Sequence, residues 1–242
     1  RCSIANEDLL YDLFGKNAQL LIDHAWGWEP CTVKAIKAYQ PAARSICSGQ
    51  VLHYPYEPDK AKLVLYEMAD MLVLDLVDSN LVTDQFVVTL DYDVENLTDP
   101  ERRKRYRGEI VTDHYGRQIP KHAHGTVNLK HPSSSTKQIL SAVSELYDRI
   151  VDKSLLIRRL NITANNVTAA SAVTHTTKGY EQLDLFTDYA ALAQQQEREK
   201  KIQRTLLMIK KKYGKNAILK GFNLEEGATA KDRNTQIGGH KA

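Results

Sequence analysis

The order of apolar periodicities between residues 41 and 168 constrains the fold more than any other feature of the sequence. The pattern predicts, in chain order, a strand over 45–52, a helix over 60–78, a strand over 81–92, a returning strand over 107–114 with 121–129, a helix over 133–151 and a strand over 155–167. This is the split βαβ pattern of ferredoxin-like domains. It predicts an α+β fold in which a four-stranded sheet carries two helices on one face and leaves the other face free for binding.

The segments on either side of this domain are simpler. Residues 1–40 predict a small helical array with too few apolar side chains to form a stable domain alone, so it resembles a remnant of something larger. Residues 169–242 predict a polar linker, a basic helix over 188–213 and a Gly/Thr/Asn-rich tail over 221–242 that is expected to be disordered.

Several classes of protein are excluded or disfavoured. No apolar run approaches the roughly 18 residues that a membrane helix needs, so no membrane partner is predicted. Asn6, Glu7 and Asp8 interrupt the first hydrophobic stretch, which leaves no secretory signal and makes a cytoplasmic protein the default. No phosphate-binding loop and no GxSxG nucleophile motif is present, so no catalytic residue is predicted.

The charge is unevenly distributed. Lys and Arg number 33 and Asp and Glu 30, which is nearly balanced. Residues 1–100, however, hold 7 basic and 16 acidic side chains, whereas residues 101–242 hold 26 basic and 14 acidic ones. An anionic partner is therefore expected to bind the second part of the chain.

Five cations lie close together between the two middle strands, where the pattern predicts a hairpin loop: Arg102, Arg103, Lys104, Arg105 and Arg107. Their mutual repulsion would be relieved by a polyanion, and further basic side chains extend the same field: Arg117, Lys121, His122 and His124. Nucleic-acid contact is the leading interpretation, and a solvated loop that keeps the protein soluble is the alternative.

The pair Arg158 and Arg159 opens the last strand. Strand alternation sends one side chain to the open face of the sheet and the other to the helix side or the edge of the domain. A guanidinium on an open face can hold a phosphate bidentately. The alternative is a pair of charges that guards an edge strand against aggregation.

The spacing His122-x-His124 raises the question of a metal site, because residues two apart on a strand share a face. No further ligand follows at a familiar spacing, and Arg117 and Lys121 would repel a cation. No metal site is predicted.

An apolar pentapeptide lies in the polar region after the linker, namely Gln182, Leu183, Asp184, Leu185 and Phe186. It suits a docking peptide that becomes ordered in the groove of a partner. The alternative is that it forms the first turn of the following helix and packs on the domain.

Several stretches together resemble the C-terminal half of Y-family lesion-bypass DNA polymerases, in the UmuC-like branch of Gram-positive bacteria and their mobile elements. They are LIDHAWG at 21–27, SICSGQVL at 45–52, LVTDQ at 81–85, VTDHYGRQIPKHAHGT at 111–126 and the ending IGGHKA at 237–242.

This resemblance implies a division of the chain into a helical thumb remnant at 1–40, a little-finger DNA-binding domain at 41–168, and a linker, clamp-binding peptide, basic helix and tail at 169–242. The palm and fingers would be missing, and a chain that starts at Arg1 fits that expectation of a fragment. The chain alone is therefore expected to be inactive and to hold no cofactor, since Mg²⁺ would belong to the palm.

The resemblance also implies partners. The little finger would lie across the major groove of primer-template DNA and contact phosphates, with Arg158 and Arg159 as the basic pair of the last strand and the Gly15 turn offering amides to a primer phosphate. The pentapeptide 182–186 resembles the sliding-clamp motif QLxLF. Error-prone translesion synthesis in DNA repair and the SOS response is the implied role, with other replication or SOS proteins as further partners. The alternative is a stand-alone, non-catalytic protein from a truncated gene that binds DNA and the clamp.

Overall fold

The computed structural model describes residues 6–29, 31–39, 44–172, 189–237 and 240–241. The chain divides into two units, 1–42 and 43–242. Within the described residues, no helix combines the length and the apolar character that a membrane span requires.

The first unit is a short series of helices: α1 (Glu7–Phe14), the 3₁₀ turn η2 (Gly15–Asn17), α2 (Ala18–Ala25) and α3 (Val33–Ala38). The side chain of Asn6 accepts from the N–H of Asp8 and so caps α1. The buried hydrophobic cluster among the described residues of this unit consists of Leu10, Ala18 and Ile22. So few buried side chains cannot stabilise an independent domain.

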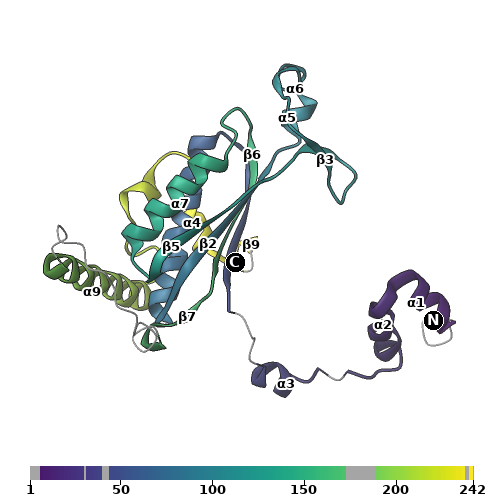
Figure 1. Ribbon diagram of the computed structural model, residues 1–242, viewed down its shortest axis with the longest axis horizontal. Coiled ribbons are helices and arrows are strands. Elements are labelled where there is room, and N and C mark those ends of the chain that lie inside the picture. The colour runs from purple at the N-terminus through teal and green to yellow at the C-terminus, as the bar shows by residue number, and fades with distance from the viewer. Residues whose placement is uncertain (1–5, 30, 40–43, 173–188, 238–239, 242) are drawn as a thin grey trace. The chain divides into compact units, whose positions relative to one another are not determined.

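The second unit is built on an antiparallel sheet with the strand order β1-β6-β2-β5 (Figure 1). The strands are β1 (Ile46–Tyr56), β2 (Leu81–Tyr92), β5 (Ala123–Ser133) and β6 (Ile157–Asn165), and the short β7 (Thr168–Ala169) pairs with the start of β2. Because β1 is an edge strand, it accommodates Pro55. The last strand by sequence thus lies between the parallel strands β1 and β2 and is antiparallel to both, which makes β1-α4-β2 a split βαβ unit.

Two helices, α4 (Pro58–Asp78) and α7 (Thr136–Ile150), cover one face of this sheet. Alternate residues of β2 and β6 point into the core beneath them, including the fully buried Phe86, Val88, Leu160 and Ile162. The α+β prediction of a four-stranded sheet with both helices on one face is confirmed.

The connection between β2 and β5 differs from the prediction. Residues 107–114 do not join the main sheet; instead β3 (Ile110–Thr112) and β4 (Gln118–Pro120) form a separate hairpin. Two short helices, α5 (Glu95–Thr98) and α6 (Pro100–Arg105), precede it. We call residues 95–120 the extension, and it projects beyond the end of the main sheet (Figure 1).

The base of the extension is fixed by one buried amide. The Nδ2 of Asn96 donates to the carbonyl groups of Asp93 (2.9 Å) and Leu156 (2.8 Å), and its Oδ1 accepts from the N–H of Leu156 (2.8 Å). The fully buried side chain of Asn96 therefore holds the extension at Leu156, the residue just before β6.

The C-terminal region also differs from the expectation of a disordered tail. The basic helix α9 (Tyr189–Tyr213) is followed by η3 (Gly221–Leu224), α10 (Ala230–Arg233) and the short strands β8 (Gln236–Ile237) and β9 (His240–Lys241). Among these, α9, η3 and α10 contact α4. The reason is a buried carboxylate on α4, Glu67, which residues 223–230 surround with donors.

Candidate nucleic-acid interface

The face of the main sheet opposite the helices presents rows of mostly polar side chains, with Val51 and Val87 among them. The strand register places Gly49, Asn161, Thr89 and His124 in one row across the four strands. On one side of it lies the row Cys47, Thr163, Val87 and Thr126, and on the other the row Val51, Arg159 and Asp91. We call these rows the open face, and none of their residues is buried.

Side-chain hydrogen bonds link neighbouring strands on the open face and in the row next to it. The hydroxyl of Thr89 contacts the Nδ1 of His124 at 2.9 Å, and the Nε2 of Gln85 donates to the Oδ1 of Asn128 at 2.9 Å. Gly49 leaves the space that the side chain of Asn161 occupies. A surface of this kind can follow a phosphate backbone without burying apolar groups.

Arg159 is the arginine that points to the open face. Its Nε lies 3.9 Å from the Oδ2 of Asp91 on the neighbouring strand, and its side chain is 55% exposed. An exposed pair at this distance contributes little stability, so a phosphate can compete for the guanidinium.

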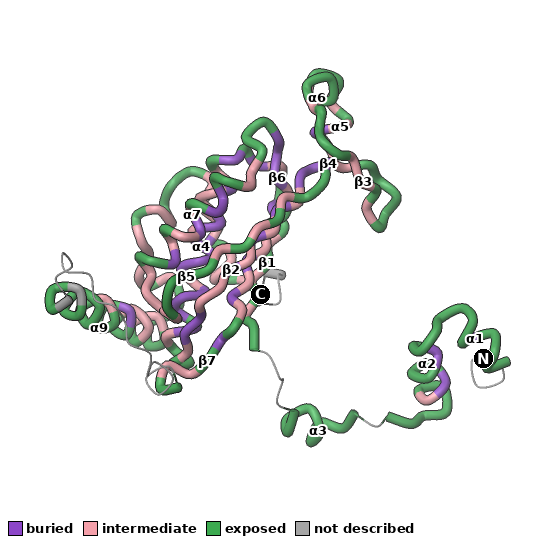
Figure 2. The backbone as a smooth tube through the Cα atoms, in the orientation of Figure 1, coloured by how far each residue is buried: buried purple, intermediate pink, exposed green. Residues whose placement is uncertain are grey.

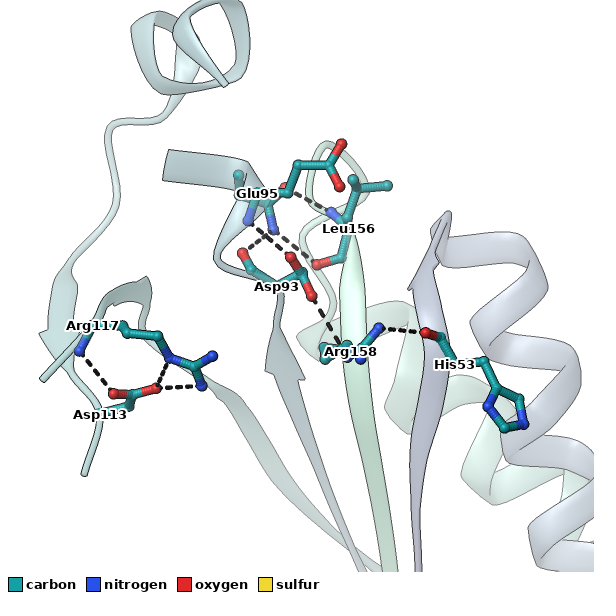
Figure 3. Close-up of polar contacts among 8 residues, drawn as sticks. His53, Asp93, Glu95, Asp113, Arg117, Leu156 and Arg158 are labelled. Atoms are coloured by element: carbon teal, nitrogen blue, oxygen red, sulfur yellow. Dashed lines mark hydrogen bonds and ion pairs between the residues drawn. The ribbon is translucent and has the colours of Figure 1, made fainter. Parts of the chain in front are cut away.

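Arg158 has a different environment because it falls in an irregularity of the β6 pairing, between Ile157 and Arg159. Its Nη1 donates to the carbonyl of His53 at 2.9 Å, and its Nε lies 3.8 Å from Asp93 (Figure 3). The side chain therefore lies at the end of the sheet, which agrees with the expectation that only one member of the pair faces the open surface.

The cluster of five cations lies partly on a helix and not in a hairpin loop. Pro100 begins α6, the side chain of Asp99 accepts from the N–H of Arg102 at 2.8 Å, and the cations fill the last turn, where the helix dipole favours them. Arg102 itself contacts Glu57 at 3.2 Å and is thereby tied to the domain. Lys104 pairs with Glu101, whereas Arg103, Arg105 and Arg107 have no ion pair within the described residues.

Two of the predicted cations of the hairpin are already ion-paired. Arg117 contacts Asp113 at 2.7 Å and Lys121 contacts Glu109 at 2.7 Å. The hydrogen bond that Lys121 donates to Glu109 raises the pKa of Lys121. His122 is exposed, and the described residues contain no group of three or more His, Cys, Asp or Glu side chains arranged to hold a metal ion.

Gly15 lies in the first unit, whereas the other predicted DNA-binding residues belong to the second. It adopts a positive φ of 56° after α1, and its own N–H donates to the carbonyl of Tyr11. The pentapeptide 182–186 lies outside the described residues.

Sequence reasoning did not single out most of the open face. A search for clustered cations does not detect these residues because they are uncharged: Gly49, Thr89, Asn161 and Thr163. The alternation of residues along strands 45–52, 81–92 and 155–167 is the signal that could have found them.

The sheet order and the two covering helices define an α+β domain of the split βαβ class. The chain belongs to the impB/mucB/samB family, because residues 43–185 match the model of that family's C-terminal domain. At the level of the family, the resemblance to Y-family polymerases is thereby confirmed. The match begins at the boundary between the two units and ends within the pentapeptide.

Solved structures similar to this chain include a Y-family DNA polymerase chimera, with 14% identity and a TM-score of 0.40 over 69% of this chain. The chain spans 40% of the length of that chimera. Another is a chain from the complex of beta-clamp processivity factor and little finger domain of PolIV. The identity is 8% and the TM-score is 0.34, and the match covers 60% of this chain and 100% of that one. A comparison with curated protein sequences finds no match.

Proposed function

We propose that this chain is the DNA-binding and clamp-docking C-terminal part of an error-prone translesion DNA polymerase of the UmuC-like branch, acting in DNA repair and damage tolerance. The observation that carries the proposal is the open face: rows of small polar groups with Arg159 at one end, in a domain of this family. Such a surface suits duplex DNA held by its phosphates and not by its base edges.

The apolar surface of the first unit supports a role within a longer protein. Leu13 is 65% exposed, Trp26 is 68% exposed and Trp28 is 58% exposed. Figure 2 shows most of α1, α2 and α3 in the colour of exposed residues. Exposed apolar side chains at this density mark a surface that another part of a protein covers. This favours the polymerase portion over the stand-alone alternative. Catalysis, with its Mg²⁺, then belongs to a palm and fingers outside this chain, which alone incorporates no nucleotide.

The proposed partners are primer-template DNA and the bacterial sliding clamp, the latter through Gln182–Phe186. Other replication or SOS proteins would meet the polymerase through the same assembly.

The first prediction concerns Arg159 and the salt dependence of DNA binding. The affinity of the purified chain for primer-template DNA should fall as salt rises, with a log–log slope of roughly −0.9 for each phosphate contacted. Arg159→Ala should weaken binding to all DNA sequences alike and reduce the slope by about one. Fluorescence anisotropy across a salt series measures both quantities.

Lys137→Ala provides the matched control, because Lys137 is an exposed cation on α7, in the helix layer on the opposite face of the sheet. It should leave the slope as it is in the unmodified chain. Equal slopes for Arg159→Ala and the unmodified chain, or an affinity that salt does not change, would contradict the proposal.

A further inference from the structure

The tip of the β3–β4 hairpin, residues 113–117, is held in one shape by a single carboxylate. Asp113 accepts from the N–H of Tyr115 at 2.9 Å. It also accepts from the N–H of Arg117 at 2.9 Å and from the Nε of Arg117 at 2.8 Å (Figure 3). Gly116 supplies the positive φ of 79° that the turn needs. Burial alone would raise the pKa of Asp113, but these hydrogen bonds hold it below its ordinary value. The tip is therefore organised before any ligand binds.

This ordered turn displays an aromatic side chain to solvent. Tyr115 is 71% exposed. The ring of His114 lies beside it, with the centroids 3.7 Å apart at an angle of 41°, and the guanidinium carbon of Arg117 lies 5.0 Å from the Tyr115 centroid. These two contacts hold the ring in place, so Tyr115 loses little conformational entropy when a flat ligand binds to the exposed part of the ring.

The surroundings of the tip are strongly basic. Residues 102–122 hold seven Lys and Arg side chains and two acidic ones, Glu109 and Asp113. Both carboxylates already have basic partners, Lys121 and Arg117. An anionic ligand with an exposed flat group fits this surface better than a peptide does. An acidic peptide would leave the ring without a partner, and an apolar peptide would leave the cations without one.

We propose that the hairpin tip binds single-stranded nucleic acid by stacking an unpaired base on Tyr115, while the neighbouring cations contact its phosphates. Aromatic side chains combined with a basic surface are the common means of binding unpaired strands, because every base has a face on which to stack. A duplex keeps its base faces covered by their neighbours. The inference rests on the proposed function and adds to it a contact with the unpaired template beside the duplex.

The test compares two probes of equal length and equal charge: an oligothymidine strand and an abasic strand with the same phosphates. The unmodified full chain should bind the oligothymidine about 5- to 100-fold more tightly, which is the worth of one stacked base. Tyr115→Ala should remove this preference and leave the affinity for a blunt duplex unchanged. Tyr115→Phe keeps the ring and should keep the preference, and thermal unfolding of all variants verifies that they fold.

Two results would overturn the inference: equal affinity of the unmodified chain for both probes, or a Tyr115→Ala variant that retains the preference. An equal loss on both probes would also contradict it, because the ring would then not be reading a base. Failure of the proposed function appears elsewhere, as an absence of salt-dependent duplex binding by the unmodified chain. Base preference and duplex binding are separate readouts, so the two failures cannot be confused.

Discussion

Gly125 and Gly49 lie on opposite faces of the main sheet and have opposite tolerance for a side chain. A Cβ at Gly125 would lie 2.7 Å from the Cγ2 of Ile150 and 2.8 Å from the Cδ1 of Leu146, both on α7. A Cβ at Gly49 would lie 2.5 Å from the Oδ1 of Asn161, the end of a side chain on the open face that can rotate away. Glycine at 125 therefore sets how closely α7 approaches the sheet.

Gly125→Ala should lower the free energy of unfolding by about 1–3 kcal/mol, because the core must shift to admit the methyl group. Gly49→Ala is the matched control and should change stability little, since only Asn161 has to move. Urea denaturation followed by circular dichroism measures both. A Gly125→Ala variant as stable as Gly49→Ala would show that α7 is not packed against β5 in this way.

The pentapeptide supplies a second prediction at the scale of single residues. In the proposed clamp contact Leu185 and Phe186 are the apolar anchors, so replacing both by alanine should cost about 2–4 kcal/mol of binding free energy for each anchor. Calorimetry with the purified sliding clamp measures the loss. Asp184→Ala, at the variable position of the peptide, should leave the affinity unchanged. Equal affinities for the double variant and the unmodified chain would refute clamp docking through this peptide.

The environments of individual side chains could be predicted only in part from the sequence. Alternation predicted that one of Arg158 and Arg159 would face the open surface, but the irregularity in β6 that decides which one has no signature in the chain. Arg117 and Lys121 were interpreted as an extension of the basic field. Each has an acidic partner, Asp113 and Glu109 respectively, that becomes its neighbour only once the hairpin has formed.

Among the elements, helix α4 depends on the C-terminal segment through one buried charge. Glu67 is 1% exposed and accepts from the Nδ2 of Asn223 (2.9 Å) and from the N–H groups of Thr229 (2.7 Å) and Ala230 (3.0 Å). Lys220 pairs with the neighbouring Asp70 at 2.5 Å. Without this segment α4 would expose two carboxylates on a face built to have them covered.

Glu67→Gln should therefore destabilise the protein by about 2–4 kcal/mol, because an amide nitrogen would face N–H donors in place of a carboxylate oxygen. Limited proteolysis should cleave this variant faster at Lys215 and Lys220, and urea denaturation measures the loss of stability. Glu226→Gln is the control: the Glu226 side chain is 88% exposed and pairs only with Lys60 among the described residues. If both variants resist protease equally, Glu67 does not anchor the segment.

The sequence predicts most reliably the helices and strands in which the spacing of apolar residues is regular over many residues. The strand predicted at 81–92 has those bounds in the structure, and the helix predicted from Ser133 begins at Thr136, where the Ser135 side chain caps it. The β3–β4 hairpin was missed because three-residue strands are too short to show a period. The tail at 221–242 was predicted to be disordered because of its composition. The composition could not reveal the contacts with Glu67, which lies far away in the sequence.

At the scale of the whole molecule, the two units differ in how completely they bury their apolar residues. The second unit encloses one core cluster that runs from Leu52 to Val167, whereas the first buries Leu10, Ala18 and Ile22 and exposes larger side chains. The uneven charge in the sequence indicated where an anionic partner would bind. It could not indicate the open face, which only strand pairing assembles.

The attachment of α9 has a consequence for the proposed clamp contact. The side chain of Glu199 accepts from the N–H of Lys137 and the hydroxyl of Ser135, and that of Gln203 donates to the carbonyl of Ser134, so α9 is fastened to the start of α7. Phe186 precedes Tyr189, the first residue of α9, by three residues. Three residues of fully extended chain span at most about 11 Å, which is the largest possible separation of Phe186 from the start of α9. In the proposed contact, a clamp that binds Phe186 would therefore lie almost against α9, which sharply limits the orientations in which it could present this chain to DNA.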